Sequence, residues 1–90
     1  MIRVHSKATG EVQGVGFRYY AQECAALCNV TGWVKNEWDG SVTLEAQGET
    51  DDVSRFLAIV RLGNRFAHVE RMTKSEIPLQ EGERGFHIRY

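Results

Sequence analysis

Three glycines and an arginine form the stretch of this sequence with the clearest chemical potential. Gly10, Gly14 and Gly16 fall within seven residues, and a helical pattern begins directly after them at Phe17. Glycine permits positive φ and leaves backbone N–H groups open to a ligand, and a helix start adds amides that have no partners. Arg18 falls in the first helical turn, where a cation is unfavourable unless it serves another purpose. The stretch indicates a cradle for an anion such as phosphate or carboxylate; the alternative is a tight turn followed by a solvated arginine.

The spacing of these glycines does not match two common nucleotide-binding motifs. Tyr19 stands where the dinucleotide fingerprint requires a third small residue, and no long parallel α/β unit follows. A Walker loop requires a lysine directly after its last glycine, but the chain has no lysine between Lys7 and Lys35. The anion is therefore expected to be held by backbone amides and an arginine.

Asn36 is a second candidate, because it stands at the end of an expected strand, just before a hairpin signal at Asp39-Gly40. Its carboxamide offers both a donor and an acceptor from a rigid element, so it could orient a small polar ligand such as water. The alternative is an asparagine that satisfies the turn itself. The residue pattern alone leaves both interpretations open.

Alternating and helical patterns predict the elements that position these residues. Ile2, Val4, Ser6 and Ala8 alternate with polar residues, as in a half-buried strand whose open face carries Arg3, His5, Lys7 and Thr9. The later patterns predict two helices: one from Phe17 that ends at Asn29, and one with Thr50 as its N-cap that runs up to Gly63. They also predict strands over 31–36 and 41–47, and a strand from Ala67 with a bulge or bend at Met72. A polar loop over 78–85 and a short strand over 86–90 complete the chain.

The order of these elements is strand, helix, strand, strand, helix, strand, followed by a short terminal strand. Each helix has one apolar stripe and each strand one apolar face, which favours two helices on one face of an antiparallel sheet. The prediction is a ferredoxin-like two-layer α+β sandwich that forms a single domain over residues 1–90.

Composition narrows the possible partners and the compartment. Eleven basic and twelve acidic residues give a net charge of −1 with no basic stripe, so nucleic-acid binding is not expected. No apolar stretch is long enough to span a membrane, and the N-terminus alternates where a signal peptide would be apolar. A cytoplasmic protein without membrane contact is expected, with a monomer as the default state. Cys24 and Cys28 are expected to be buried, reduced thiols; the alternative is a redox pair.

No metal site or nucleophile-based hydrolase motif is indicated. The three histidines, His5, His68 and His87, are scattered singly over strand segments, and no Ser-His-Asp or His-Glu-x-x-His pattern is present.

Over essentially its whole length the sequence resembles the acylphosphatases. The matching segments are Gly10-x-Val12-Gln13-Gly14-Val15-Gly16-Phe17-Arg18-Tyr19, Gly32-Trp33-Val34-Lys35-Asn36, Asp39-Gly40-Ser41-Val42, Ala46-Gln47-Gly48 and Phe86-x-Ile88-Arg89-Tyr90. The resemblance implies a hydrolase that cleaves the carboxyl-phosphate bond of small acyl phosphates without a metal or organic cofactor, with inorganic phosphate as product and competitive inhibitor.

The resemblance also implies residue roles. Arg18 and the loop residues Gln13, Gly14, Val15, Gly16 and Phe17 would bind the phosphate, and Asn36 would position the attacking water. Two departures are Glu11, where a basic or polar residue is common, and Asn64, where the family often has proline. The second departure is expected to concern a loop and to leave the site untouched.

Two binding modules compete with this interpretation, because fold alone does not decide function. An RNA-binding sheet would need exposed aromatic residues and a basic surface, which the first strand lacks. A phosphate-sensing domain without turnover would keep the same cradle, and only an assay separates it from an enzyme.

Overall fold

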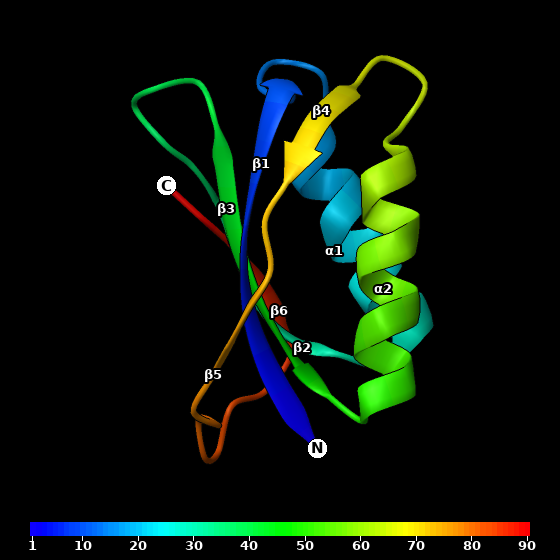
Figure 1. Cartoon of the computed structure of the whole chain (residues 1–90), viewed down its shortest axis with the longest axis vertical. Coiled ribbons are helices and arrows are strands. Elements are labelled where there is room, and N and C mark those ends of the chain that lie inside the picture. Colours follow the sequence, from blue (N-terminus) through cyan, green and yellow to red (C-terminus); the bar gives the residue numbers. More distant parts are fainter.

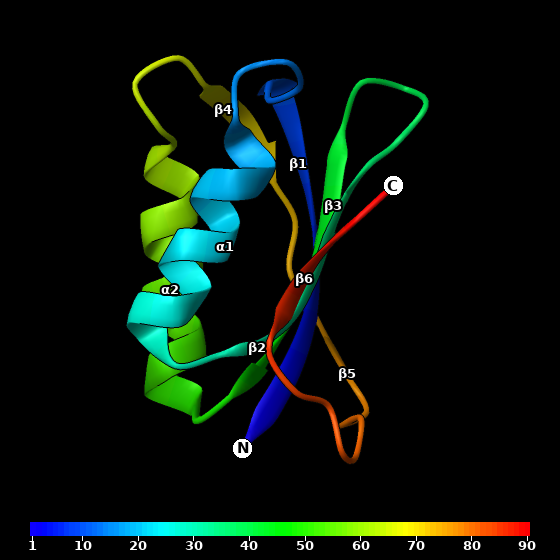
Figure 2. The ribbon, with the colours of Figure 1, turned by 180° about the vertical axis from the view of Figure 1, so that it is seen from behind.

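The computed structural model describes all of residues 1–90 as two helices packed against one sheet (Figure 1). In chain order the elements are β1 (Ile2–Glu11), α1 (Phe17–Cys28), β2 (Thr31–Asn36), β3 (Val42–Gly48), α2 (Thr50–Leu62), β4 (His68–Met72), β5 (Ser75–Ile77) and β6 (Phe86–Arg89). Both helices cover the same face of the sheet (Figure 2). This is the predicted ferredoxin-like α+β sandwich. Neither helix combines the length and the apolar composition that a membrane span requires.

The sheet has the order β4-β1-β3-β2-β6, and β5 pairs with β1 beside β4. All neighbours are antiparallel except β2 and β6, which run parallel, so the prediction of a wholly antiparallel sheet was wrong. The reason lies in the loop after β5. It reverses the chain at the end of the sheet far from the β2–β3 hairpin, and β6 must therefore run back in the direction that β2 already takes (Figure 2).

The predicted irregularity of the fourth strand lies at Glu70. Thr9 of β1 pairs with Arg71 and Gly10 pairs with Val69, so Glu70 is an extra residue on β4. The strand then ends at Met72, and β5 continues beside β1. Gly10 is required by this close pairing, since its φ is 121° and a Cβ there would lie 2.3 Å from the carbonyl oxygen of His68.

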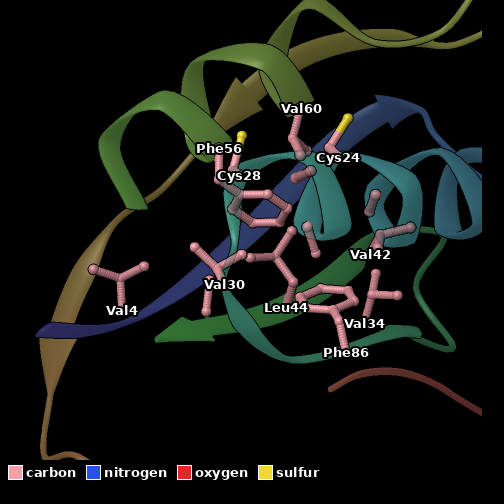
Figure 3. Packing of buried hydrophobic residues seen from close by; sticks show 14 of the residues in the cluster. Val4, Cys24, Cys28, Val30, Val34, Val42, Leu44, Phe56, Val60 and Phe86 are labelled. Carbon is pink, nitrogen blue, oxygen red and sulfur yellow. The ribbon is translucent and has the colours of Figure 1, made fainter. Parts of the chain in front are cut away.

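The hydrophobic core fills the space between the helices and the sheet (Figure 3). Phe56 of α2 packs against Phe86 of β6, with ring centroids 5.5 Å apart, and Val60 and Leu44 belong to the same buried cluster. Cys24 and Cys28 are both free and buried within this core, as the sequence predicted. Burial raises the pKa of the Cys24 thiol, which favours an unreactive, protonated group.

The helix ends agree with the sequence at α1 and differ at α2. Asn29 ends α1 in the left-handed conformation with φ 59°, as predicted. At α2, however, Thr50 is already helical and Glu49 occupies the N-cap position without a side-chain hydrogen bond, so the predicted cap was wrong. Asp51 and Asp52 lie in the first turn and favour the helix start through the helix dipole.

Arg3 lies on the predicted open face but is only 1% exposed, so this strand position is not solvated as expected. The chain between β5 and β6 crosses that face and covers the side chain. Arg3 Nη1 donates to Glu83 Oε1 at 2.8 Å, and its Nε donates to Glu45 Oε1 at 3.0 Å. The pairing of a polar loop with a buried arginine thus fixes the segment that leads into β6.

Candidate active site

A small hollow of about 90 Å³ opens at one end of the sheet, where the β1–α1 connection meets the end of β2. We call residues 12–16 of that connection the glycine loop; it lies beside the β2–β3 hairpin at the same end of the molecule (Figures 1 and 2). The hollow is lined by Val12, Gly14, Gly16, Phe17, Arg18, Tyr19 and Asn36. The structure therefore brings together the two stretches that the sequence singled out.

The glycine loop presents backbone amides. Gly14 and Gly16 both have φ of 74°, in the left-handed region that favours glycine. Gly16 is also the N-cap of α1 and makes no side-chain capping bond. No hydrogen bond within the protein uses the N–H groups of residues 13–16, and the first-turn amides of α1 have no intrahelical acceptors. Gly14, Gly16 and the first residues of α1 line the hollow, so free donors and the positive end of the helix dipole lie beside it.

Gly10 takes no part in this arrangement. It lies within β1 and does not line the hollow, so its contribution is to strand pairing. Phe17 has a double role, because its backbone opens the helix at the hollow while its side chain is buried in the core. Packing of the Phe17 ring therefore anchors the start of α1 beside the glycine loop.

Arg18 contributes the only charged side chain that lines the hollow. Its Nη1 donates to the carbonyl oxygen of Arg89 at 3.4 Å, and its guanidinium lies 4.9 Å from the centre of the Tyr90 ring. No carboxylate forms an ion pair with it, since the ion pairs of the chain involve other residues. Its positive charge is therefore free for an anion in the hollow.

Asn36 ends β2, and its Oδ1 atom is buried without a hydrogen-bond partner. The hairpin that follows is closed by other groups. Asp39 Oδ1 accepts from the backbone N–H of Ser41, and the backbone N–H of Glu37 donates to the Ser41 carbonyl at 2.8 Å. The turn thus does not use the Asn36 carboxamide, and a buried polar atom without a partner calls for an explanation such as a ligand.

Gln13 links the glycine loop to the hairpin. Its Nε2 donates to the carbonyl oxygens of Glu37 at 2.7 Å and Ser41 at 2.8 Å. The side chain is therefore engaged with the hairpin, and what Gln13 can offer to an anion is its backbone N–H. Since Glu37 follows Asn36 directly, this link also sets where Asn36 lies relative to the loop. Val15 likewise has no side chain in the lining of the hollow.

Sequence reasoning missed three further contributors, Asn64, Arg89 and Tyr90. Asn64 Nδ2, in the α2–β4 connection, donates to the carbonyl oxygen of Val15 at 2.7 Å. The expectation that the departure at Asn64 leaves the site untouched was therefore wrong. In the sequence, Arg89 and Tyr90 match the family pattern without indicating a role at the site, but in the structure they contact Arg18. The contacts of Asn64, Arg89 and Tyr90 join distant parts of the chain and leave no local pattern in the sequence.

The donor set of the hollow consists of amides, a guanidinium and a carboxamide. It contains no carboxylate, imidazole or thiolate, and nowhere in the chain do three or more such side chains gather as metal ligands would. Chemically, the hollow can bind a small anion and hold one polar molecule against the Asn36 carboxamide.

Comparison with known proteins gives a consistent family. The family model described as Acylphosphatase matches residues 4–88. The acylphosphatase of Clostridium acetobutylicum is 48% identical over 90 residues, covering 100% of this chain and 99% of the relative, and that of Geobacillus thermodenitrificans is 46% identical, covering 100% and 96%. The crystal structure of acylphosphatase from Bacillus subtilis superposes with a TM-score of 0.95 at 37% identity, with 100% of both chains covered.

Proposed function

The chain belongs to the acylphosphatase family, whose members are hydrolases, and from this premise we propose how its own residues act. Residues 1–90 function as a single acylphosphatase unit. The backbone N–H groups of residues 13–17 and the guanidinium of Arg18 bind the phosphoryl group of a small acyl phosphate. Asn36 positions the attacking water. The observation that carries this proposal is that free amides, an arginine without an ion-pair partner and the partnerless Asn36 Oδ1 meet in one small hollow.

The reaction requires little covalent assistance from the protein. The water oxygen forms a bond to phosphorus while the bond between phosphorus and the acyl oxygen breaks, and the electron pair leaves with the carboxylate. A phosphoryl oxygen of the substrate takes the water proton, so no separate base is needed. The protein supplies position and charge, because a phosphoryl transition state spreads negative charge over its oxygens and places the entering and leaving groups in line.

Each element of the site has a part in this chemistry. The loop amides and Arg18 hold the phosphoryl oxygens where negative charge is concentrated. The Asn36 Oδ1 accepts a hydrogen bond from the water, which fixes the water on the side of the hollow that faces β2. Because the hollow is small, the acyl portion lies outside it, and the site demands little of that portion.

We also propose that the activity needs no metal or organic cofactor, because the side chains around the hollow are not metal ligands. We propose a cytoplasmic monomer that binds neither nucleic acid nor membrane. The overall charge of −1 gives no general attraction for polyanions.

The test is hydrolysis of benzoyl phosphate, assayed with EDTA present and with inorganic phosphate as inhibitor. The proposal expects full turnover in EDTA and competitive inhibition by phosphate. Phosphate at ten times its dissociation constant should also stabilise the fold by about 1.4 kcal/mol. A protein that hydrolyses no acyl phosphate but is stabilised by phosphate would be a phosphate-sensing module, and loss of turnover in EDTA that added metal restores would contradict the metal-free mechanism.

A further inference from the structure

Asn64 lies in the connection between α2 and β4, and both polar atoms of its carboxamide form hydrogen bonds. Its Oδ1 accepts from the backbone N–H groups of Phe66 at 3.0 Å and Ala67 at 2.7 Å. Its Nδ2 donates to the carbonyl oxygen of Val15 at 2.7 Å. The first two bonds close a turn within the connection, as asparagine often does. The third reaches the glycine loop and has no part in that turn.

The bond to Val15 sets the direction of the amide that follows it. In a trans peptide the C=O and N–H groups lie in one plane and point in opposite directions, and the chain has no cis peptide. Since the Val15 carbonyl points toward Asn64, the N–H of Gly16 points away from Asn64. Gly16 lines the hollow and Asn64 does not. A Gly16 N–H that points away from Asn64 can donate to a ligand in the hollow.

Few other contacts hold this peptide: the Val15 side chain packs against the core and the Gly16 carbonyl accepts from the Tyr20 N–H at 3.0 Å, but no other hydrogen bond reaches the Val15 carbonyl. Gly14 and Gly16 stand on either side of Val15, and without Cβ atoms they allow large changes of φ and ψ at low steric cost. A Cβ built on Gly14 would meet nothing within 4 Å, so the loop is not packed there. Gly16 has no side-chain cap either. Without the bond from Asn64, no hydrogen bond would set the orientation of the Val15-Gly16 peptide.

We propose that Asn64 is a positioning residue, which holds the Gly16 N–H toward the bound phosphoryl group through its bond to the Val15 carbonyl. This inference rests on the proposed function of the glycine loop. The hydrogen bonds of Asn64 to the loop and of Gln13 to the hairpin hold the glycine loop on two sides before substrate binds. This matters because preorganised donors need no reorientation during the reaction.

The decisive variant is Asn64→Ser. A serine hydroxyl can accept from the same turn amides, but it is too short to donate to Val15, and it leaves the charge unchanged. Phe66→Ala is the matched control, because it trims an exposed neutral side chain from the same connection. If Asn64→Ser fails to fold, Asn64→Asp takes its place, because an aspartate keeps both acceptor contacts and cannot donate to Val15. The amide shift of Gly16 is then measured on that variant.

Three quantities are measured on each variant: the inhibition constant of inorganic phosphate, the melting temperature, and the ¹⁵N–¹H amide shifts at saturating phosphate. We expect Asn64→Ser to raise the inhibition constant about tenfold, as for one weakened charge-assisted hydrogen bond, while Phe66→Ala leaves it unchanged. At saturation the Gly16 amide shift should be large in the parent protein and small in Asn64→Ser. The Phe17 amide, fixed by the helix start, should shift in both.

A purely structural role for Asn64 predicts a different result. Asn64→Ser would then lower the melting temperature but keep the parent inhibition constant and the full Gly16 shift, and that outcome overturns the inference while leaving the proposed function intact. If phosphate neither inhibits the parent protein nor shifts any amide of residues 13–17, the proposed function of the loop fails, and the role of Asn64 fails with it.

Discussion

The guanidinium of Arg18 lies 4.9 Å from the centre of the Tyr90 ring, at the opposite end of the chain. Its Nη1 also reaches the carbonyl oxygen of Arg89 at 3.4 Å. These contacts hold a charged side chain at the hollow without neutralising it, because an aromatic face and a carbonyl attract the cation but bring no full negative charge. The last two residues therefore help to place the group that we propose binds the phosphoryl anion.

Replacement of Tyr90 tests this placement. Tyr90→Ala should raise the inhibition constant of inorganic phosphate about two- to fivefold, the factor for losing one exposed cation–π contact of about 0.5 to 1 kcal/mol. Tyr90→Phe keeps the ring and should stay close to the parent protein. Inhibition kinetics with benzoyl phosphate provide the measurement, and equal constants for the Ala and Phe variants would show that the ring does not place Arg18.

The geometry of the Arg18 donors can be separated from its charge with Arg18→Lys. A lysine offers a point charge where arginine offers a planar fork, so phosphate affinity and turnover should each fall about tenfold or more. Steady-state kinetics at low and at moderate salt measure the effect. Near-parent kinetics in this variant would mean that long-range charge is the whole contribution of Arg18.

Acid should loosen the segment before β6 through Glu83. Burial favours the neutral form of this carboxyl, but hydrogen bonds from Arg3 and Thr31 outweigh it, and the pKa of Glu83 falls below its ordinary value of 4.5. A depressed pKa gives stability that is complete above about pH 4.5 and is lost as the pH falls through the folded-state value. Glu83→Gln should therefore lower the free energy of unfolding by about 1 to 3 kcal/mol at pH 7, and by much less at pH 3.

Urea unfolding at both pH values measures this difference, and Glu81→Gln, in the same connection but exposed, is the matched control. A Glu83→Gln deficit of equal size at pH 7 and pH 3 would show that the carboxylate charge is not what holds the segment.

Local pattern in the sequence was enough to predict most of the fold. Alternation and helical periodicity are set by which side chains meet the core, so they located both helices and the main strands. Local pattern could not show that β6 runs parallel to β2, because the direction of a last strand depends on where the preceding loop turns. Nor could it show that Arg3 is buried, since the cover comes from Glu83, 80 residues away.

The same division holds for the site. The glycines and Arg18 are adjacent in the chain, so their spacing alone predicts that they act together. The contacts that hold them in place leave no such pattern, because Asn64 contacts Val15 across 49 residues and Arg18 contacts Arg89 across 71. Nor could the sequence show that the Gln13 side chain donates to the hairpin, because its partners lie 24 and 28 residues away.

Asn36→Ala tests the central claim, that Asn36 positions the water and the loop binds the phosphate. Removing the carboxamide should lower the turnover number about 100-fold or more, as for one lost positioned polar group, while the inhibition constant of phosphate stays nearly unchanged. The free energy of unfolding should not fall, because the variant removes a buried oxygen that has no partner. Asp39→Ala, which removes a hairpin contact and leaves Asn36 in place, is the control for general loosening.

The most direct single measurement is therefore the turnover number of folded Asn36→Ala with benzoyl phosphate, read beside its inhibition constant for phosphate. The account predicts that turnover collapses while phosphate binding persists, and that Asp39→Ala retains most of its turnover. A folded Asn36→Ala protein that turns over at the parent rate would contradict the account and leave Arg18 and the glycine loop as the whole site.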